Sequence, residues 1–162
     1  MSIEIAELTF NPKAKRLKKL ELLRKDLRFK CQRCAVFCCR LGGPTLNVKD
    51  RQRLRQAGTK DENVVKSVKD NVRICLKETE NGSCVFLEYD DESKQHACSI
   101  YDLRPSLCRL YPFEFTLTGP NTGVLKIIPC CNGLNAADGE LVDQKFVEKN
   151  LLEPIMDSVK TE

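Results

Sequence analysis

Residues 31–39 read CQRCAVFCC and place four cysteines within nine positions. The two-residue spacing of Cys31 and Cys34 lets both sulfurs turn toward one ion at a bend of the chain. Thioredoxin-type redox sites share this spacing, but they use two thiols and follow a strand. Adjacent residues such as Cys38 and Cys39 point in different directions, so we expect this pair to be divided between two centres, or between a centre and the core. The segment therefore predicts a metal-binding fold.

The remaining six cysteines are spread along the rest of the chain: Cys75, Cys84, Cys98, Cys108, Cys130 and Cys131. Two short apolar segments around a charged loop predict a hairpin that brings Cys84 near Cys98. Cys108 follows ten residues after Cys98, and Cys130 forms a second vicinal pair with Cys131. The sequence thus offers distant partners for the leading cysteines.

The start of the chain favours a reducing compartment for these thiols. The residues MSIEIAELTF lack the basic start and continuous apolar stretch of a secretion signal. No segment approaches the roughly 20 apolar residues that cross a membrane. We therefore predict a cytoplasmic protein without membrane contact, whose cysteines bind metal more readily than they form disulfides or stay as buried thiols.

Composition predicts a globular domain with a thin apolar core. The chain has 162 residues, of which 41% are hydrophobic, 6% are aromatic and none is tryptophan. This length suits one domain, and a bound metal would help to hold it together. The formal charge of +4 is weak evidence for a nucleic-acid partner, because bound thiolates would offset it.

We predict an α+β fold, a small metal-stabilised domain with several short helices around short β-hairpins. The single domain spans residues 1–162, with a basic N-terminal helix in 1–30, a cysteine-cluster metal-binding core in 31–133 and a C-terminal helix in 134–162. Leucines at three-to-four spacing between basic residues place the first helix at about 12–29. These leucines are Leu17, Leu20, Leu22 or Leu23, and Leu27.

Further elements follow from caps, breakers and alternation. Asn47 with Asp50 predicts a helix start, and Gly58 predicts its end. We expect a helix at 60–70, a strand at 72–76 and a turn at Asn81-Gly82. We also expect hairpins formed by 84–87 with 96–101 and by 113–117 with 124–128, helical turns within 104–111, and a helix at 139–150 that continues past Pro154 after a kink or break.

The cysteine pattern resembles the CxxCxxCC cysteine-cluster family, which is described as a zinc- or iron-chelating domain. The family shows a leading cysteine cluster, a cysteine before an apolar pair, a stretch of the form C-x-I-Y-x-x-R-P-x-x-C-R-x-Y-P-F, and a later cysteine near a glycine. Here the most specific stretch runs from Cys98 to Phe113, and the resemblance covers roughly residues 29–133. The chain departs from the family in having three residues, Ala35 to Phe37, before its vicinal pair, and Cys75 and Cys130 have no counterpart.

The resemblance implies eight metal ligands, with Cys130 as an additional candidate: Cys31, Cys34, Cys38, Cys39, Cys84, Cys98, Cys108 and Cys131. Eight thiolates would fill two tetrahedral zinc sites, two cubane clusters or one of each. Both zinc and iron–sulfur clusters accept sulfur ligands. We favour an iron–sulfur cluster of the 4Fe–4S type over zinc, in one or two centres, because the family is often described as containing such clusters.

We expect other residues near the cysteines to support the metal ligands. Arg104 and Arg109 flank Cys108, where they either donate to cluster sulfurs or pair with nearby carboxylates. We expect Tyr101 and Tyr111 to pack around the site. The single histidine, His96, fits an exposed loop better than a ligand position.

The leading functional prediction is an electron-transfer or metal- and cluster-assembly protein that works with a protein partner. The alternative is a zinc-ribbon-like module for nucleic acid or protein, in which the basic residues of 13–30 contact phosphates. A lysine methylase is related to the family, but the chain carries no recognisable cofactor loop and no catalytic constellation apart from its thiols. The sequence therefore favours a binding protein over an enzyme.

Overall fold

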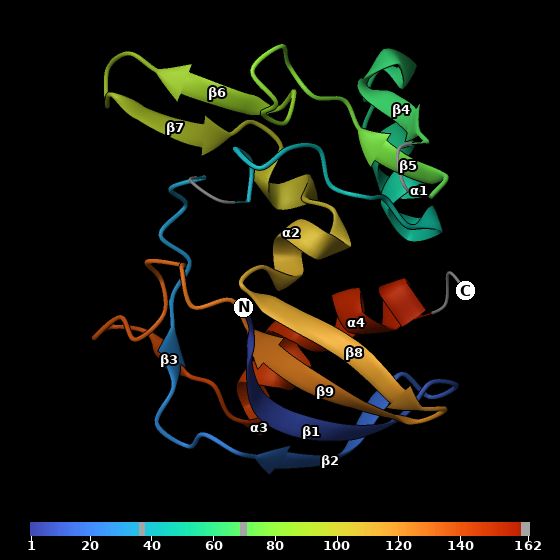
Figure 1. Ribbon diagram of the computed structural model, residues 1–162, viewed down its shortest axis with the longest axis vertical. Helices are drawn as coiled ribbons and strands as arrows, with labels where there is room; N and C mark the ends of the chain where they lie inside the picture. The colour runs from blue at the N-terminus through green and yellow to red at the C-terminus, as the bar shows by residue number, and fades with distance from the viewer. Residues whose placement is uncertain (36–37, 69–70, 160–162) are drawn as a thin grey trace. The chain divides into compact units, whose positions relative to one another are not determined.

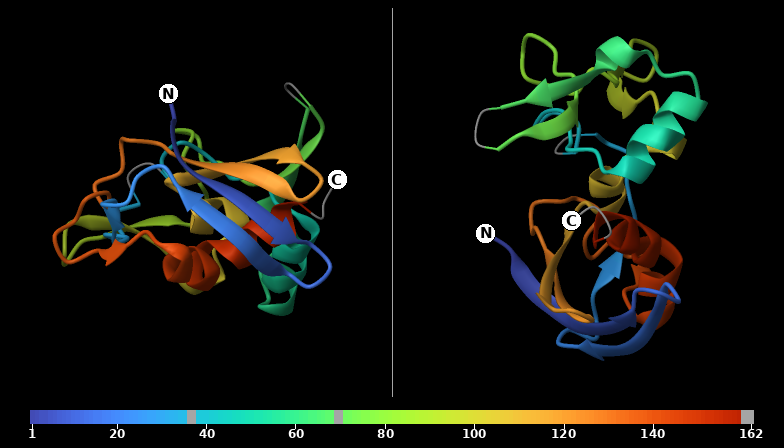
Figure 2. Two further views of the ribbon diagram at one scale, coloured as in Figure 1. Left: turned by 90° about the horizontal axis from the view of Figure 1, so that it is seen from below. Right: turned by 90° about the vertical axis from the view of Figure 1, so that its right-hand side faces the viewer.

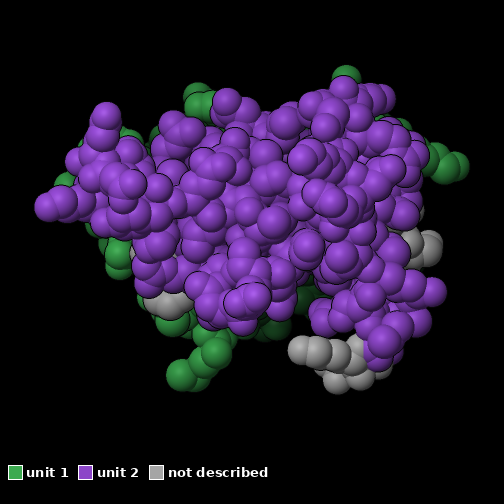
Figure 3. All heavy atoms as spheres, turned by 90° about the horizontal axis from the view of Figure 1, so that it is seen from above, with its two compact units in different colours: residues 1–32, 110–160 green, residues 33–109, 161–162 purple. Residues whose placement is uncertain are grey.

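The computed structural model describes residues 1–35, 38–68 and 71–159. Its contacts divide the chain into two compact units, coloured separately in Figure 3. Within the described residues, unit 1 combines 1–32 with 110–159, and unit 2 consists of residues from 33 to 109. The α+β class is confirmed, because short helices and antiparallel strand pairs make up the chain (Figure 1). The assignment of all 162 residues to one domain stays a prediction.

Unit 1 is built on a four-stranded antiparallel sheet in the order β2-β1-β9-β8. The strands are β1 (Ile3–Asn11), β2 (Arg16–Leu22), β8 (Phe113–Gly119) and β9 (Thr122–Ile127). Alternating side chains of β9 are buried, as expected for a sheet with one covered face. The hairpin predicted around 113–128 is confirmed.

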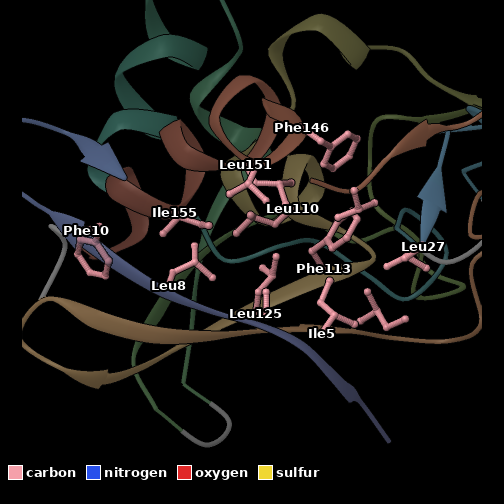
Figure 4. Close-up of a cluster of buried hydrophobic side chains, with 14 of the residues drawn as sticks. Ile5, Leu8, Phe10, Leu27, Leu110, Phe113, Leu125, Phe146, Leu151 and Ile155 are labelled. Carbon is pink, nitrogen blue, oxygen red and sulfur yellow. The ribbon is translucent and has the colours of Figure 1, made fainter. Parts of the chain in front are cut away.

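A helical segment covers the inner face of this sheet (Figures 1 and 2). It consists of α3 (Gln144–Phe146), a π-helical turn (Val147–Leu151) and α4 (Leu152–Val159). Their apolar side chains pack against the strands, as Figure 4 shows for Leu151 and Ile155 beside Leu8 and Leu125. Fifteen buried residues form this core, so unit 1 has an ordinary hydrophobic interior.

The predicted basic helix at 12–29 is wrong. Residues 16–22 form β2, which pairs with β1, and Arg28–Phe29 form β3, which pairs with β10 (Glu140–Leu141). A β-bulge produced the misleading spacing. The pairing shifts between Thr9 and Phe10, so the inward leucines of β2 are three residues apart and then two, which resembles helical spacing. The lysines of this segment lie on a hairpin, not on a helix.

The C-terminal helix begins later than predicted. Residues 140–141 are held in a strand, and Asp143 caps α3 by accepting from the Phe146 N–H at 3.0 Å. The helix then continues past Pro154 as expected. A π turn precedes the proline there.

Unit 2 contains α1 (Val48–Gln56), a 3₁₀ turn (Asp61–Asn63) and two strand pairs. These pairs join β4 (Val64–Ser67) with β5 (Arg73–Leu76), and β6 (Leu87–Asp90) with β7 (Gln95–Cys98). A second 3₁₀ turn (Tyr101–Leu103) precedes α2 (Ser106–Leu110). The cap at Asn47, the strand at 73–76 and the turns around 106 confirm the predictions for these segments. A hairpin also forms where 84–87 and 96–101 were predicted, but its strands are shifted, because β6 begins only at Leu87 and β7 ends at Cys98.

The predicted helix at 60–70 is wrong for its described part. Val64 and Val65 pair with Leu76 and Cys75 in an antiparallel ladder, and residues 69–70 lie outside the described residues. β-branched residues favour strands when a partner strand is available. Within the described part of the chain, no helix has both the length and the apolar character that crossing a membrane requires.

Candidate metal centre

Five cysteines of unit 2 lie close enough to one another to affect each other's ionisation: Cys38, Cys39, Cys84, Cys98 and Cys108. We call these five residues the unit 2 thiol group. Backbone contacts assemble part of it. The Cys84 N–H donates to the Cys39 carbonyl oxygen at 2.8 Å, and Cys98 at the end of β7 pairs with Leu87. Residues far apart in the sequence therefore meet here.

Cys39 interacts with two other members of the group. It is 4% exposed, and its thiol hydrogen-bonds to the sulfurs of Cys38 and Cys98. These hydrogen bonds and burial raise the pKa of Cys39. The bond from Cys39 lowers the pKa of Cys38 to about 7 and the pKa of Cys98 to about 6. A metal cation can replace a proton that several sulfurs share in this way, because metals bind thiolates.

Among the described residues, neither Cys84 nor Cys108 accepts a hydrogen bond from another thiol. Burial raises the pKa of both, and the neighbouring sulfurs of Cys38 and Cys98 add to the effect. Buried thiolates of like charge repel one another in a medium that solvates them poorly. The thiols of Cys84 and Cys108 therefore keep their protons until a cation replaces them.

Three candidate ligands share one local geometry, in which the sulfur accepts an N–H from the residue two positions later. Phe86 donates to Cys84, and Ile100 donates to Cys98. Gly133 donates to Cys131 at 3.4 Å. Such bonds stabilise a thiolate and orient it toward a metal. Each of these cysteines is followed by a turn that suits a ligand.

Unit 1 carries three cysteines outside this group: Cys31, Cys130 and Cys131. The Lys30 N–H donates to the Gly133 carbonyl oxygen at 3.0 Å, and Phe29 forms a bridge with Leu134. This antiparallel pairing brings the segment of Cys31 alongside the segment of Cys131. In unit 1, the chain segments that carry the first and last cysteines of the family pattern therefore pair with each other.

Gly133 is essential to this pairing. A Cβ at this position would lie 2.3 Å from the Lys30 carbonyl oxygen and 2.9 Å from the Phe29 ring. We expect Gly133→Ala to lower the free energy of unfolding by about 1–3 kcal/mol, because backbone atoms must move apart. Urea unfolding of the full chain measures the loss. Asn132→Ala, at the exposed neighbouring position, serves as the control, and an equal loss in both variants would contradict the steric explanation.

The structure places the remaining candidates as follows. Cys34 is half-buried at the start of unit 2, while Cys75 packs in β5 with its sulfur 3.9 Å from the Thr45 hydroxyl. Arg104 lies near Cys38 and Cys98 and lowers the pKa of both thiols. Arg109 and Tyr111 are half-buried. All ten cysteines carry free thiols.

His96 is less exposed than the sequence indicated. Its ring packs on Tyr89 at 5.1 Å between centroids, and its Nδ1 is buried with no hydrogen-bond partner among the described residues. Together with Cys84 it lines a cavity of about 480 Å³. The prediction of an exposed loop residue is therefore wrong, because His96 lies within β7.

A buried polar network that the sequence analysis missed fixes the start of α2. The Asp50 carboxylate is 1% exposed and accepts from the Ser106 N–H and the Ser106 hydroxyl, both at 3.0 Å. The Asn47 amide donates to the same hydroxyl at 2.9 Å. Asp50 was recognisable only as a partner in a helix cap, since its contact with Ser106 spans 56 residues. Through Ser106, the network positions the helix that carries Cys108.

The sulfur atoms of the unit 2 thiol group are the kind of ligand that a thiophilic metal binds, and they lie near one another. Among the described residues, no three His, Cys, Asp or Glu side chains are already arranged so that they could hold a metal ion. The five sulfurs nevertheless act on one another, and hydrogen bonds link three of them. Soft thiolates are the ligands that zinc and iron–sulfur clusters take.

Comparison with known proteins agrees with this chemistry. The sequence profile of the CxxCxxCC family, described as a "Putative zinc- or iron-chelating domain", matches residues 30–132, which is more than half of the chain. An uncharacterized protein of Methanocaldococcus jannaschii, MJ0661, is 29% identical over 137 residues, covering 79% of this chain and 70% of that protein. No solved structure matches.

Proposed function

Because the chain belongs to the CxxCxxCC family of zinc- or iron-chelating domains, we propose that it is a metal-binding protein with an all-cysteine centre built on the unit 2 thiol group. The hydrogen-bonded sulfurs of Cys38, Cys39 and Cys98 carry this proposal. Loss of the shared proton when a cation binds leaves three thiolates at one place. Cys84 and Cys108 supply further sulfurs beside them.

A 4Fe–4S cluster is the favoured occupant, and electron transfer or cluster assembly with a protein partner is the favoured role. When bound, such a cluster supplies one-electron redox chemistry. The chain supports that use by donating N–H groups to sulfur and by placing Arg104 near the thiols, since hydrogen bonds and charge set a cluster's potential. Zinc, with a structural role, is the alternative occupant.

Elemental analysis of protein purified without oxygen tests this proposal. We expect iron and inorganic sulfide in the protein and an absorbance near roughly 400 nm from sulfur-to-iron charge transfer. Zinc alone, without this absorbance, would overturn the redox role and leave a structural metal site. The absence of iron and zinc together would overturn metal binding itself.

Two cysteine variants sharpen the measurement. Cys98→Ser removes a member of the thiol group, so we expect it to lose most of the bound metal. Cys75→Ser is the matched control, because Cys75 is also a strand residue of unit 2 and contacts Thr45 instead of the group. Equal metal content in the two variants would exclude the unit 2 thiol group as the site.

A further inference from the structure

We propose that Arg33, stacked on the ring of Tyr101, is the positioning residue that holds Cys34 in place as a ligand of the unit 2 metal centre. This inference rests on the proposed function, because Cys34 is a ligand only if unit 2 binds a metal. Cys34 lies one residue after Arg33, and both belong to unit 2. The contact between Arg33 and Tyr101 therefore restrains the backbone directly next to Cys34.

Tyr101 is contacted by two guanidinium groups. The Arg33 guanidinium carbon lies 3.7 Å from the centre of the ring, and that of Arg104 lies 3.8 Å from it. Arg104 also donates from Nε to the Tyr101 carbonyl oxygen at 2.9 Å. Planar guanidinium groups stack well on aromatic faces. Since Tyr101 lies between Cys98 and Cys108 in sequence, the stack ties the segment of Cys34 to the segment of these two candidate ligands.

The backbone on both sides of Cys34 needs such support. Arg33 has a φ of 55° and Ala35 has a φ of 54°, which places two residues with side chains in the left-handed region. Each costs about 1 kcal/mol or more and persists only where its surroundings fix it. Ala35 is fixed by burial, since it is 4% exposed within the unit 2 core. Arg33 is exposed, so its contact with Tyr101 is the fixing interaction on the other side.

This arrangement gives the arginine a geometric role beyond its charge. The direction of the Cys34 side chain depends on the backbone at 33–35, because both flanking residues hold unusual φ angles. Loss of the stack would release residue 33 toward ordinary backbone angles and turn the Cys34 sulfur away. Lost supporting contacts of this kind typically weaken metal binding about 10- to 100-fold.

Site-resolved alkylation of the full chain tests the proposal. The protein is loaded with zinc(II) without oxygen and treated with iodoacetamide, and peptide mass spectrometry follows each cysteine. In the unchanged protein we expect zinc to protect both Cys34 and Cys98. In Arg33→Ala and in Tyr101→Leu we expect Cys34 to react about tenfold faster or more, while Cys98 stays protected. Tyr101→Phe keeps the ring and should keep Cys34 protected.

Arg40→Ala is the matched control, because it removes an exposed arginine that directly follows Cys39. Equal exposure of Cys34 in this control and in Arg33→Ala would overturn the proposal in favour of a general charge effect. Unchanged protection of Cys34 in Arg33→Ala would also overturn it. If Arg33→Ala fails to fold, the comparison of Tyr101→Phe with Tyr101→Leu decides. Equal alkylation with and without zinc in the unchanged protein, together with the absence of both iron and zinc from the purified protein, would instead contradict the proposed function.

Discussion

Removing the metal unfolds unit 2 and leaves unit 1 folded. This is the expected result when metal-loaded protein is treated with a chelator, because the two units differ in their apolar cores. Among the described residues, unit 1 buries fifteen in one cluster, whereas the cluster of unit 2 has six, and two of these are cysteines. Binding of a structural zinc contributes about 10–16 kcal/mol in small zinc-finger peptides. A comparable contribution would decide whether unit 2 folds.

Hydrogen exchange followed by mass spectrometry measures the effect segment by segment. After chelation we expect the amides of α1 and β5 to exchange rapidly, while those of β1 and β9 stay protected. Cys75→Ser, with its metal still bound, is the control for a change in a unit 2 strand without metal loss. Protection of α1 and β5 that does not change on chelation would contradict a stabilising role of the metal.

Asp50→Ala should produce the largest loss of stability among single substitutions outside the cysteines. Its carboxylate accepts from the Asn47 N–H at 3.1 Å, from the N–H and hydroxyl of Ser106, and from the Arg53 guanidinium. Removal of the carboxylate leaves buried donors without an acceptor. We expect a loss of about 3 kcal/mol or more in the free energy of unfolding.

Urea unfolding of the metal-loaded protein measures this loss. Asp61→Ala removes an exposed carboxylate of the same unit and should change the free energy of unfolding by about 0.5 kcal/mol or less. Asp50→Asn keeps the size of the side chain and tests the need for the charge. If Asp50→Ala were no more harmful than Asp61→Ala, the network would have no role in positioning α2.

Local signals in the sequence predicted much of unit 2. Asn47 and Asp50 form the expected capping box, and Gly58 follows α1 with a φ of 84°. These features depend on residues close together in the chain, which is why a sequence pattern reveals them. The β6–β7 hairpin also followed from neighbouring residues, and it places Cys98 at the end of a strand as the cysteine pattern needs.

Features that depend on distant pairing were not predictable in the same way. The bulge at Lys18 in β2 changed the spacing of the inward leucines of this strand, so they suggested a helix. The N-terminal strand itself went unrecognised, although Ile3, Ile5, Leu8 and Phe10 hint at alternation. The contacts of Asp50 with Ser106 and of Arg33 with Tyr101 join segments more than fifty residues apart, and no local pattern reveals either contact.

The basic hairpin of unit 1 has a consequence for solubility. β2 is an outer strand of the sheet and, among the described residues, pairs with no strand other than β1, so it presents an open edge. An open edge of this kind invites another chain to add a strand and begin aggregation. Exposed Lys18 and Lys19 on this strand oppose such growth by charge repulsion between like edges. The lysines that suggested contact with phosphates are thus also placed where they would oppose self-association of the sheet.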